Sequence, residues 1–265
     1  MTDAPPHLLV EESEGILVVT LNRPEKLNAL SLQTMQGIEA AVVRLRDTDA
    51  LKVMLLRATG RYFSAGVDLK EENDRRGETA RGLREDLRLR TKGMQRIYDE
   101  MEHIEKPIVA AHHAPCVGGG LEMSLSCDFR LAAESATYGL PEAGLGVLPA
   151  SNGVSRLTRI CGPHWARYLI MANKTVTAQQ ALNMGLVHEV HPDASFEQAV
   201  MDFCRHLAKQ NGEVLGAAKI AIELASELGR DSARQVERLA NCGLSLDPGF
   251  AQGWQNYVDR VGGKE

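Results

Sequence analysis

The sequence predicts an α/β fold with one core domain followed by a helical C-terminal region. Up to about residue 190, segments rich in β-branched residues alternate with segments of helical periodicity. Strands separated by helices in this way favour repeated ββα-like units with right-handed crossovers. A chain of 265 residues is long enough for one α/β domain and a short appendage. We therefore place the core domain at residues 1–192 and the helical region at residues 193–265.

The N-terminal part of the chain carries the clearest secondary-structure signals. Residues 8–21 read as two strands, and Glu14-Gly15 between them suits a tight turn, so we expect a hairpin. Ser31 is a favourable N-cap for a helix that ends near Asp47. The remaining predicted elements are a strand at 52–58, a helix at 78–104, a strand at 108–113, a glycine-rich turn at 118–120 with a short helix, a strand at 128–133, a helix after Asn152-Gly153, a strand at 186–190, and three helical segments after about residue 195.

Composition and charge exclude several classes of protein. Hydrophobic residues make up 44% of the chain and charged residues 25%, which is typical of a folded globular protein. The net charge of −5 and the lack of a basic cluster argue against nucleic acid as a partner. The five cysteines form no CxxC pair, so we expect reduced thiols and no metal site. Without a signal-like segment or a long apolar run, we expect a cytoplasmic protein that does not span a membrane.

Three glycines follow the strand at 108–113 and open a short helix, in the segment CVGGGLE at 116–122. Glycine allows a backbone to approach a ligand closely, and the first amides of a helix have no intrahelical partner. Such amides can stabilise an oxyanion or polarise a thioester carbonyl. An ordinary flexible turn is an equally open interpretation of these glycines alone.

A second loop, YFSAGVDLK at 62–70, follows the strand at 52–58. Its small residues leave the N–H of Val67 free to become a second donor to the same oxygen. Two donors from separate loops suit a thioester enolate, whose charge appears only during the reaction. The alternative interpretation is an ordinary loop between a strand and a helix.

Glu122 and Glu142 are the candidate carboxylates for proton transfer. Glu142 lies in the glycine- and proline-containing segment YGLPEAGLG at 138–146. A carboxyl group held among small apolar residues can have a raised pKa and act as a general acid or base. The two residues are too far apart to share one helix face, so only the fold can bring them together. Taken singly, each is more readily interpreted as a solvated glutamate.

Together these segments resemble the enoyl-CoA hydratase/isomerase (crotonase) family. Its successive signatures are matched in order by LNRPEKLNALS, YFSAGVDLKE, KPIVAAHHAPCVGGGLEMSLSCD, YGLPEAGLGVLP and ALNMGLVHEV. The resemblance implies the crotonase (ClpP-like) spiral of ββα units with a C-terminal helical trimerisation region. It also implies an acyl-CoA thioester substrate, no cofactor beyond the coenzyme A of that substrate, and a homotrimer or a dimer of trimers.

The resemblance also assigns roles to residues. Val67 and Gly119 match the two oxyanion-hole amides, and Glu122 and Glu142 match the two catalytic carboxylates. The resemblance further implies contacts with coenzyme A, although exposed lysines and a packed helix aromatic are an open alternative for several of them. The implied coenzyme A-binding residues are Lys26, Leu27, Ala29, Ala65, Asp68, Leu69, Lys70, Tyr257 and Arg260.

Because both glutamates are present, the resemblance favours an enoyl-CoA hydratase, which adds water across the C2=C3 bond. In the same family, the relatives that isomerise dienoyl thioesters or displace an aryl halide look to carry an aspartate where this chain has Ala150. Those activities are therefore disfavoured. An enoyl-CoA isomerase and a noncatalytic binding protein on the same scaffold remain alternatives. We also predict that the polar segment 71–95 forms one wall of the acyl pocket, with a solvated surface helix as the alternative.

Overall fold

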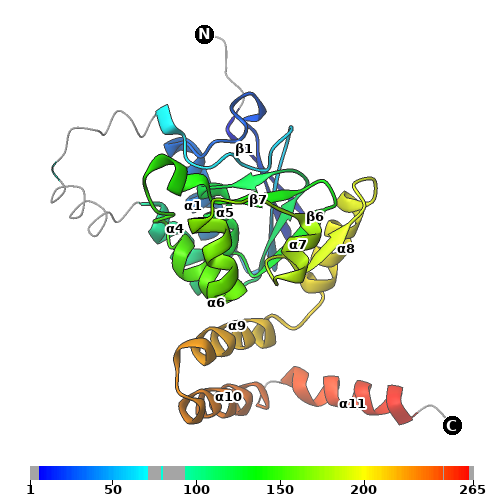
Figure 1. Ribbon diagram of the computed structural model, residues 1–265. Helices are drawn as coiled ribbons and strands as arrows, with labels where there is room; N and C mark the ends of the chain where they lie inside the picture. The colour runs from blue at the N-terminus through cyan, green and yellow to red at the C-terminus, as the bar shows by residue number, and fades with distance from the viewer. Residues whose placement is uncertain (1–5, 71–78, 80–92, 247, 263–265) are drawn as a thin grey trace. The chain divides into compact units, whose positions relative to one another are not determined.

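The computed structural model describes residues 6–70, 79, 93–246 and 248–262 (Figure 1). The chain divides into two compact units, Met1–Lys209 and Gln210–Glu265, which we describe separately. Among the described residues, no helix is both long and apolar enough to cross a membrane.

A six-stranded sheet forms the centre of the first unit. Its strands lie in the order β1-β2-β3-β4-β6-β9, and all neighbours are parallel except the antiparallel pair β1 and β2. Glu14 and Gly15 connect that pair with positive φ angles of 53° and 76°, as a two-residue hairpin turn requires. The predicted hairpin is therefore confirmed. The strands are β1 (Leu8–Ser13), β2 (Ile16–Leu21), β3 (Val53–Ala58), β4 (Ile108–His112), β6 (Phe129–Ala133) and β9 (Glu189–His191).

Helices and a small second sheet complete the first unit. Ser31 caps the first helix through its side chain, which accepts a hydrogen bond from the Thr34 amide, and the helix ends at Asp47 as predicted. The helices are α1 (Leu32–Asp47), α4 (Met94–His103), α5 (Gly119–Leu125), α6 (Gly153–Ala166), α7 (Ala178–Asn183) and α8 (Phe196–Ala208), with shorter helical turns η1 (Pro24–Lys26), η2 (Pro141–Leu145) and η3 (Arg167–Met171). The second sheet consists of β5 (Cys116–Val117), β7 (Thr137–Gly139) and β8 (Val176–Thr177).

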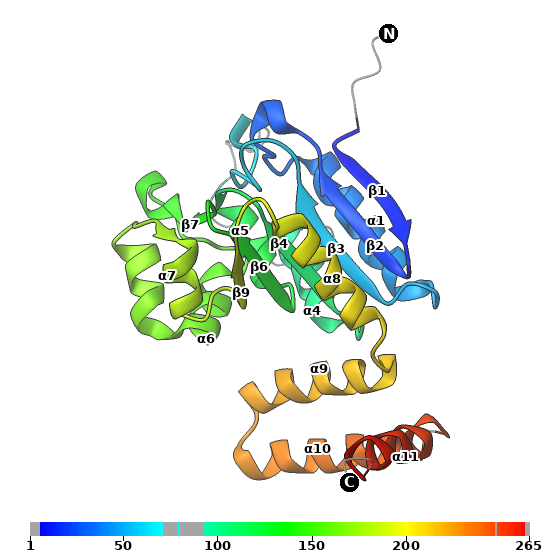
Figure 2. The same ribbon diagram turned by 90° about the vertical axis from the view of Figure 1, so that its right-hand side faces the viewer.

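The central strands β2, β3, β4 and β6 are buried on both faces of the sheet, and their successive side chains point alternately to one face and the other. Leu55 and Val109 pack with Phe196 of α8 on one face. Leu56 and Ile108 belong to the larger cluster on the other face, together with residues of α1, α4 and α5. Figure 2 shows α8 lying across the sheet on the side opposite α1. This double coverage explains why the central strands are continuous apolar runs.

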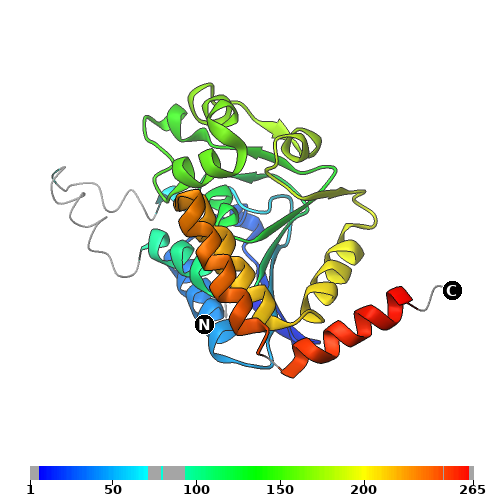
Figure 3. The ribbon, with the colours of Figure 1, turned by 90° about the horizontal axis from the view of Figure 1, so that it is seen from below.

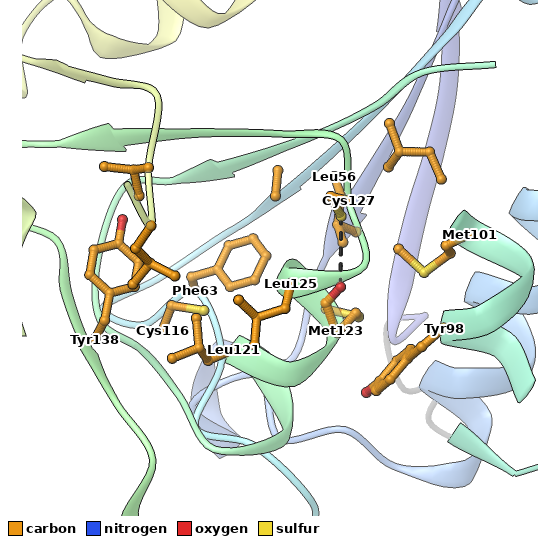
Figure 4. Packing of buried hydrophobic residues seen from close by; sticks show 14 of the residues in the cluster. Leu56, Phe63, Tyr98, Met101, Cys116, Leu121, Met123, Leu125, Cys127 and Tyr138 are labelled. Carbon is orange, nitrogen blue, oxygen red and sulfur yellow. Dashed lines mark hydrogen bonds between the residues drawn. The ribbon is translucent and has the colours of Figure 1, made fainter. Parts of the chain in front are cut away.

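Helix α5 lies inside this larger cluster, and every one of its residues is buried. Figure 4 shows Leu121 and Leu125 of α5 packed among side chains that include Phe63 and Tyr98. Tyr98 reaches α5 from α4, and its hydroxyl donates a hydrogen bond of 3.2 Å to the Gly119 carbonyl. The glycine-rich turn before α5 is therefore held in place, because α5 is buried on all sides and its first residue is bonded to Tyr98 of α4.

Some elements differ from the sequence prediction. Four helices follow residue 195 among the described residues, rather than three, and α8 packs on β2, β3 and β6. The first unit accordingly extends to Lys209, whereas the predicted core stops at residue 192. The predicted strand at 186–190 is present only as β9. Of the predicted helix at 78–104, α4 is found, while residues 80–92 lie outside the described residues.

The second unit contains α9 (Gly212–Glu227), α10 (Arg230–Leu244) and α11 (Pro248–Gly262). The antiparallel helices α9 and α10 pack against each other, as Figure 3 shows. Many large apolar side chains of this unit are exposed in the single chain. They include Ile222, Leu239, Leu246, Phe250, Trp254, Tyr257 and Val261.

Two serines at helix N-caps provide a matched test of local stability. Ser31 bonds the Thr34 amide and is buried, whereas Ser195 precedes α8 without a side-chain cap bond. We expect Ser31→Ala to lower the free energy of unfolding by about 0.5–2 kcal/mol, and Ser195→Ala to lower it by less. Urea denaturation followed by circular dichroism measures both values. Equal losses in the two variants would show that the cap bond contributes nothing specific.

Candidate active site

Two loops from neighbouring strands meet at the edge of the large sheet. β3 and β4 are parallel, so the loops that follow them leave the sheet at the same edge. The Val117 amide donates to the Ser64 carbonyl at 3.0 Å, and Ser64 pairs with Cys116 in a β-bridge. A β carbon on Gly66, whose φ is +92°, would lie 3.0 Å from the Gly119 nitrogen. Glycine at position 66 is therefore what permits the two backbones to come so close.

This approach brings the amides of Val67 and Gly119 together. A β carbon on Gly119 would lie only 3.3 Å from the Val67 nitrogen. Gly119 is the first residue of α5, so its N–H has no partner within the helix. Among the described residues, neither amide donates a hydrogen bond. Two neighbouring N–H groups with free hydrogens can bind one carbonyl oxygen or oxyanion.

Glu122 lies one turn into α5 and its side chain is almost completely buried. Its Oε1 atom accepts hydrogen bonds from the Ser151 amide at 2.8 Å and the Gly153 amide at 3.2 Å. Burial raises the pKa of Glu122 to about 7, and the nearby charge of Glu142 acts in the same direction, while the two amide hydrogen bonds oppose the rise. Glu122 can therefore exchange a proton near neutral pH.

Glu142 is the second residue of η2, which Pro141 opens. Its Oε1 atom would lie 3.0 Å from a β carbon on Gly118, so the carboxyl group sits beside the glycine-rich turn. Its Oε2 atom is buried and has no hydrogen-bond partner among the described residues. Burial raises the pKa of Glu142, and a hydrogen bond from its own backbone opposes that rise. The fold thus places both predicted carboxylates next to the predicted amide pair.

Several residues with a predicted role in coenzyme A binding lie along one pair of adjoining segments. The Ala65 amide donates to the Leu27 carbonyl at 2.9 Å. Arg23 links the same segments, because its Nη1 atom donates to the Ala29 carbonyl at 2.8 Å and to Asp68 at 3.2 Å. The exposed residues on these segments are Lys26, Leu69 and Lys70.

The other two predicted coenzyme A contacts lie in the second unit. Tyr257 and Arg260 belong to α11, where the guanidinium group lies 5.6 Å from the centre of the tyrosine ring. Tyr257 is about half exposed, so it is not a core aromatic of the single chain. Most of the segment 71–95, predicted to form an acyl-pocket wall, lies outside the described residues.

Sequence reasoning missed three contributors to the site. The amides of Ser151 and Gly153 bind Glu122, and Tyr98 binds the Gly119 carbonyl. A backbone amide leaves no side-chain signature, and Tyr98 falls in a helix whose buried face looks like any other core stripe. The glycine that opens α6 was the single usable signal, because a close approach explains a glycine at a helix start. Among the described residues, no group of three potential metal ligands is found.

The chain is similar in sequence to known hydratases over most of its length. The chain is 31% identical over 223 residues to a crotonyl-CoA hydratase from Syntrophomonas wolfei, covering 83% of this chain and 79% of the relative. It is 32% identical over 235 residues to the 2,3-dehydroadipyl-CoA hydratase of Escherichia coli, covering 87% of each.

Solved structures show the same fold. The enoyl-CoA hydratase of Bacillus anthracis superposes with a TM-score of 0.87 at 28% identity, covering 96% of each chain. That of Thermoplasma volcanium gives 0.84 at 28% identity, covering 95% of this chain and 97% of the other. The predicted crotonase fold is thereby confirmed. Residues 11–260 match the family model described as enoyl-CoA hydratase/isomerase, and the chain belongs to that family.

Proposed function

We propose that this protein is an enoyl-CoA hydratase, which converts a 2-enoyl-CoA into a 3-hydroxyacyl-CoA. The observation that carries the proposal is that the buried carboxyl group of Glu122 and the half-buried one of Glu142 lie around the glycine-rich turn that brings the free amides of Val67 and Gly119 together. Hydratases named for crotonyl-CoA and 2,3-dehydroadipyl-CoA among the relatives support it. The reaction needs no cofactor beyond the coenzyme A of the substrate, and a cytoplasmic location stays a prediction from the sequence.

The amide pair polarises the substrate. When the thioester oxygen accepts hydrogen bonds from Val67 and Gly119, electron density moves from the C2=C3 bond toward the carbonyl. C3 becomes electrophilic, and the negative charge that develops on addition is held as an enolate. Because these donors are fixed backbone groups, little reorganisation is needed as the charge appears.

The two carboxyl groups handle the protons in different ways. Glu122 has two amide donors on one oxygen, which favour its ionised form, so we assign it as the base that takes a proton from water. The oxygen of that water bonds to C3. Glu142 has a buried oxygen without a donor, which favours a bound proton, so we assign it as the acid that protonates C2. One hydrogen and one hydroxyl are thus added, and a proton passing from Glu122 to Glu142 restores the starting state.

The adjoining segments of Leu27–Ala29 and Ala65–Lys70 would hold the coenzyme A portion of the substrate. Lys70 and Lys26, which directly precedes the first of these segments, are exposed and suited to phosphate groups, for which lysine is a common partner. A role of Tyr257 and Arg260 in coenzyme A binding stays a prediction from the family resemblance.

We further propose that the protein assembles as a homotrimer or a dimer of trimers. The exposed apolar side chains of the second unit, such as Trp254 and Leu239, support an interface, because so much apolar surface is unusual on a monomer.

Replacing each glutamate by glutamine tests the reaction directly. General acid-base catalysis contributes about 10²- to 10⁴-fold, so Glu122→Gln and Glu142→Gln should each lower kcat by about that factor without weakening substrate binding. The double variant should lose far less than the product of the two factors, since the pair acts as a unit. Loss of enoyl-thioester absorbance measures kcat, and Glu134→Gln, at an exposed glutamate, serves as the control.

One outcome of this experiment would replace the proposal. If Glu142→Gln abolished turnover while Glu122→Gln kept most of it, a single base would suffice. The reaction would then be isomerisation of the double bond, without addition of water.

The pH dependence of kcat/KM tests the role of Glu122. A base must be ionised, and the pKa of Glu122 is raised to about 7. We therefore expect kcat/KM to fall by about tenfold for each pH unit below about 7, as Glu122 becomes protonated, and to fall again at alkaline pH, as Glu142, the proposed acid, ionises. A profile without a decrease below about pH 7 would contradict the assignment of Glu122 as the base.

Light scattering at micromolar concentration tests the assembly. We expect three or six times the mass of one chain, and a lower mass for Trp254→Glu, which places a charge on the exposed apolar surface. A monomer of the unmodified protein would contradict the proposed assembly.

A further inference from the structure

A buried cation lies behind the loop that binds Glu122. Arg156 projects from α6, and its side chain is only 6% exposed. Its Nε and Nη2 atoms donate to the two carboxylate oxygens of Glu102 at 2.7 and 2.5 Å, and Nη2 also donates to Asp99 at 2.7 Å. Both acidic residues come from α4. A bidentate pair of this kind fixes the guanidinium group in both position and orientation.

The same ion cluster holds the loop at residues 151–152. Arg156 donates from Nη1 to the Ser151 carbonyl at 3.3 Å. The Asn152 side chain donates to Asp99 at 2.8 Å, although Asn152 stands at the N-cap of α6, where its side chain could have capped the helix. Asn152 also has a φ of +66°, a left-handed conformation that turns the chain sharply between its neighbours. Two contacts therefore connect the loop to α4. The Ser151 carbonyl is connected through Arg156, and the Asn152 side chain is bonded to Asp99 directly.

The far side of this loop faces the carboxyl group of Glu122. The amides of Ser151 and Gly153 donate to the same Oε1 atom. A β carbon on Gly153 would lie 2.7 Å from that oxygen, so the loop already sits as close as a residue without a side chain allows. Any retreat of the loop would lengthen both hydrogen bonds, because both come from one short run of backbone.

We propose that Arg156 is a positioning residue, which, paired with Asp99 and Glu102, holds the 151–153 loop so that its two amides bind the carboxylate of Glu122. The contacts trace one continuous path from α4 through Arg156 and Ser151 to Glu122. The effect on the reaction rate rests on the proposed function, but the effect on the ionisation of Glu122 does not.

The charges of the cluster act in the same direction. Burial alone would lower the pKa of Arg156, but the hydrogen bonds and charges of Glu102 and Asp99 outweigh it and raise the pKa, so Arg156 stays cationic. The positive charge of Arg156 in turn lowers the pKa of Glu122, as do the two amides. Burial and the charge of Glu142 raise the pKa of Glu122, and loss of Arg156 would remove one of the effects that oppose this rise. The ionised form of Glu122 should then be less stable.

The direct test follows the Glu122 carboxyl carbon by NMR during a pH titration, with the signal assigned by its loss in Glu122→Gln. We expect the pKa of Glu122 to rise by at least one unit in Arg156→Met. The acid limb of kcat/KM should move to higher pH by the same amount, so the loss relative to the unmodified enzyme should be about tenfold at pH 6 and should shrink to a few-fold once the pH exceeds the shifted pKa. Arg159→Met removes the same charge from an exposed site on α6 and should leave the titration unchanged.

A second variant covers the case in which Arg156→Met does not fold. Asn152→Gly keeps the ion cluster and tolerates the left-handed conformation, but removes the hydrogen bond to Asp99. We expect a smaller shift in the same direction. An unchanged Glu122 titration in a folded variant, or an equal loss of activity at every pH, would overturn the proposal and leave Arg156 as a structural tie between α4 and α6. Absence of hydration by the unmodified protein would instead refute the proposed function, because the titration does not depend on turnover.

Discussion

The close approach of two backbones, at Gly66 and at Gly118-Gly119, is the constraint on which the rest of the site depends. A β carbon on Gly66 would meet the Gly119 nitrogen, and one on Gly118 would meet the Glu142 carboxyl group. The parallel pair β3 and β4 delivers the two loops to one edge, and the absence of side chains lets them touch. The two free amides and the Glu142 carboxyl group are thereby gathered beside one glycine-rich turn.

Burial of the carboxyl groups has a cost, and neighbouring elements offset it. Glu122 sits on a helix whose every residue is buried, so its charge would be unfavourable without donors. The donors come from the N-terminal end of α6, where unpaired amides and the helix dipole both favour a negative charge. Helix α4 supports both partners, through Tyr98 on one side and the Arg156 cluster on the other. The protonation of one glutamate is therefore set by the packing of three helices.

The elements that could be predicted from the sequence are those with local signals. The hairpin at 8–21 and the helix capped by Ser31 follow from turn chemistry, capping and periodicity. Family signatures located the loops of Val67 and Gly119. The strands of the second sheet are two or three residues long, which is too short to show a periodic pattern. The sequence of α8 shows an apolar face but does not indicate which part of the protein that face packs against. Arg156 looks in the sequence like any surface arginine, because its burial depends on partners more than fifty positions away.

Two identical side chains can perform opposite tasks only if the fold makes their surroundings unequal. Glu122 and Glu142 repel each other when both are charged, so one proton shared between them is the favourable state. The Ser151 and Gly153 amides both donate to Glu122, whereas Glu142 has a hydrogen bond from its own backbone and a buried Oε2 atom without a donor among the described residues. These unequal sets of donors make the electrostatic surroundings of the two carboxyl groups different. This difference comes from placing one glutamate opposite a helix N-terminus and the other in a short helical turn, so the direction of proton flow is a property of the backbone.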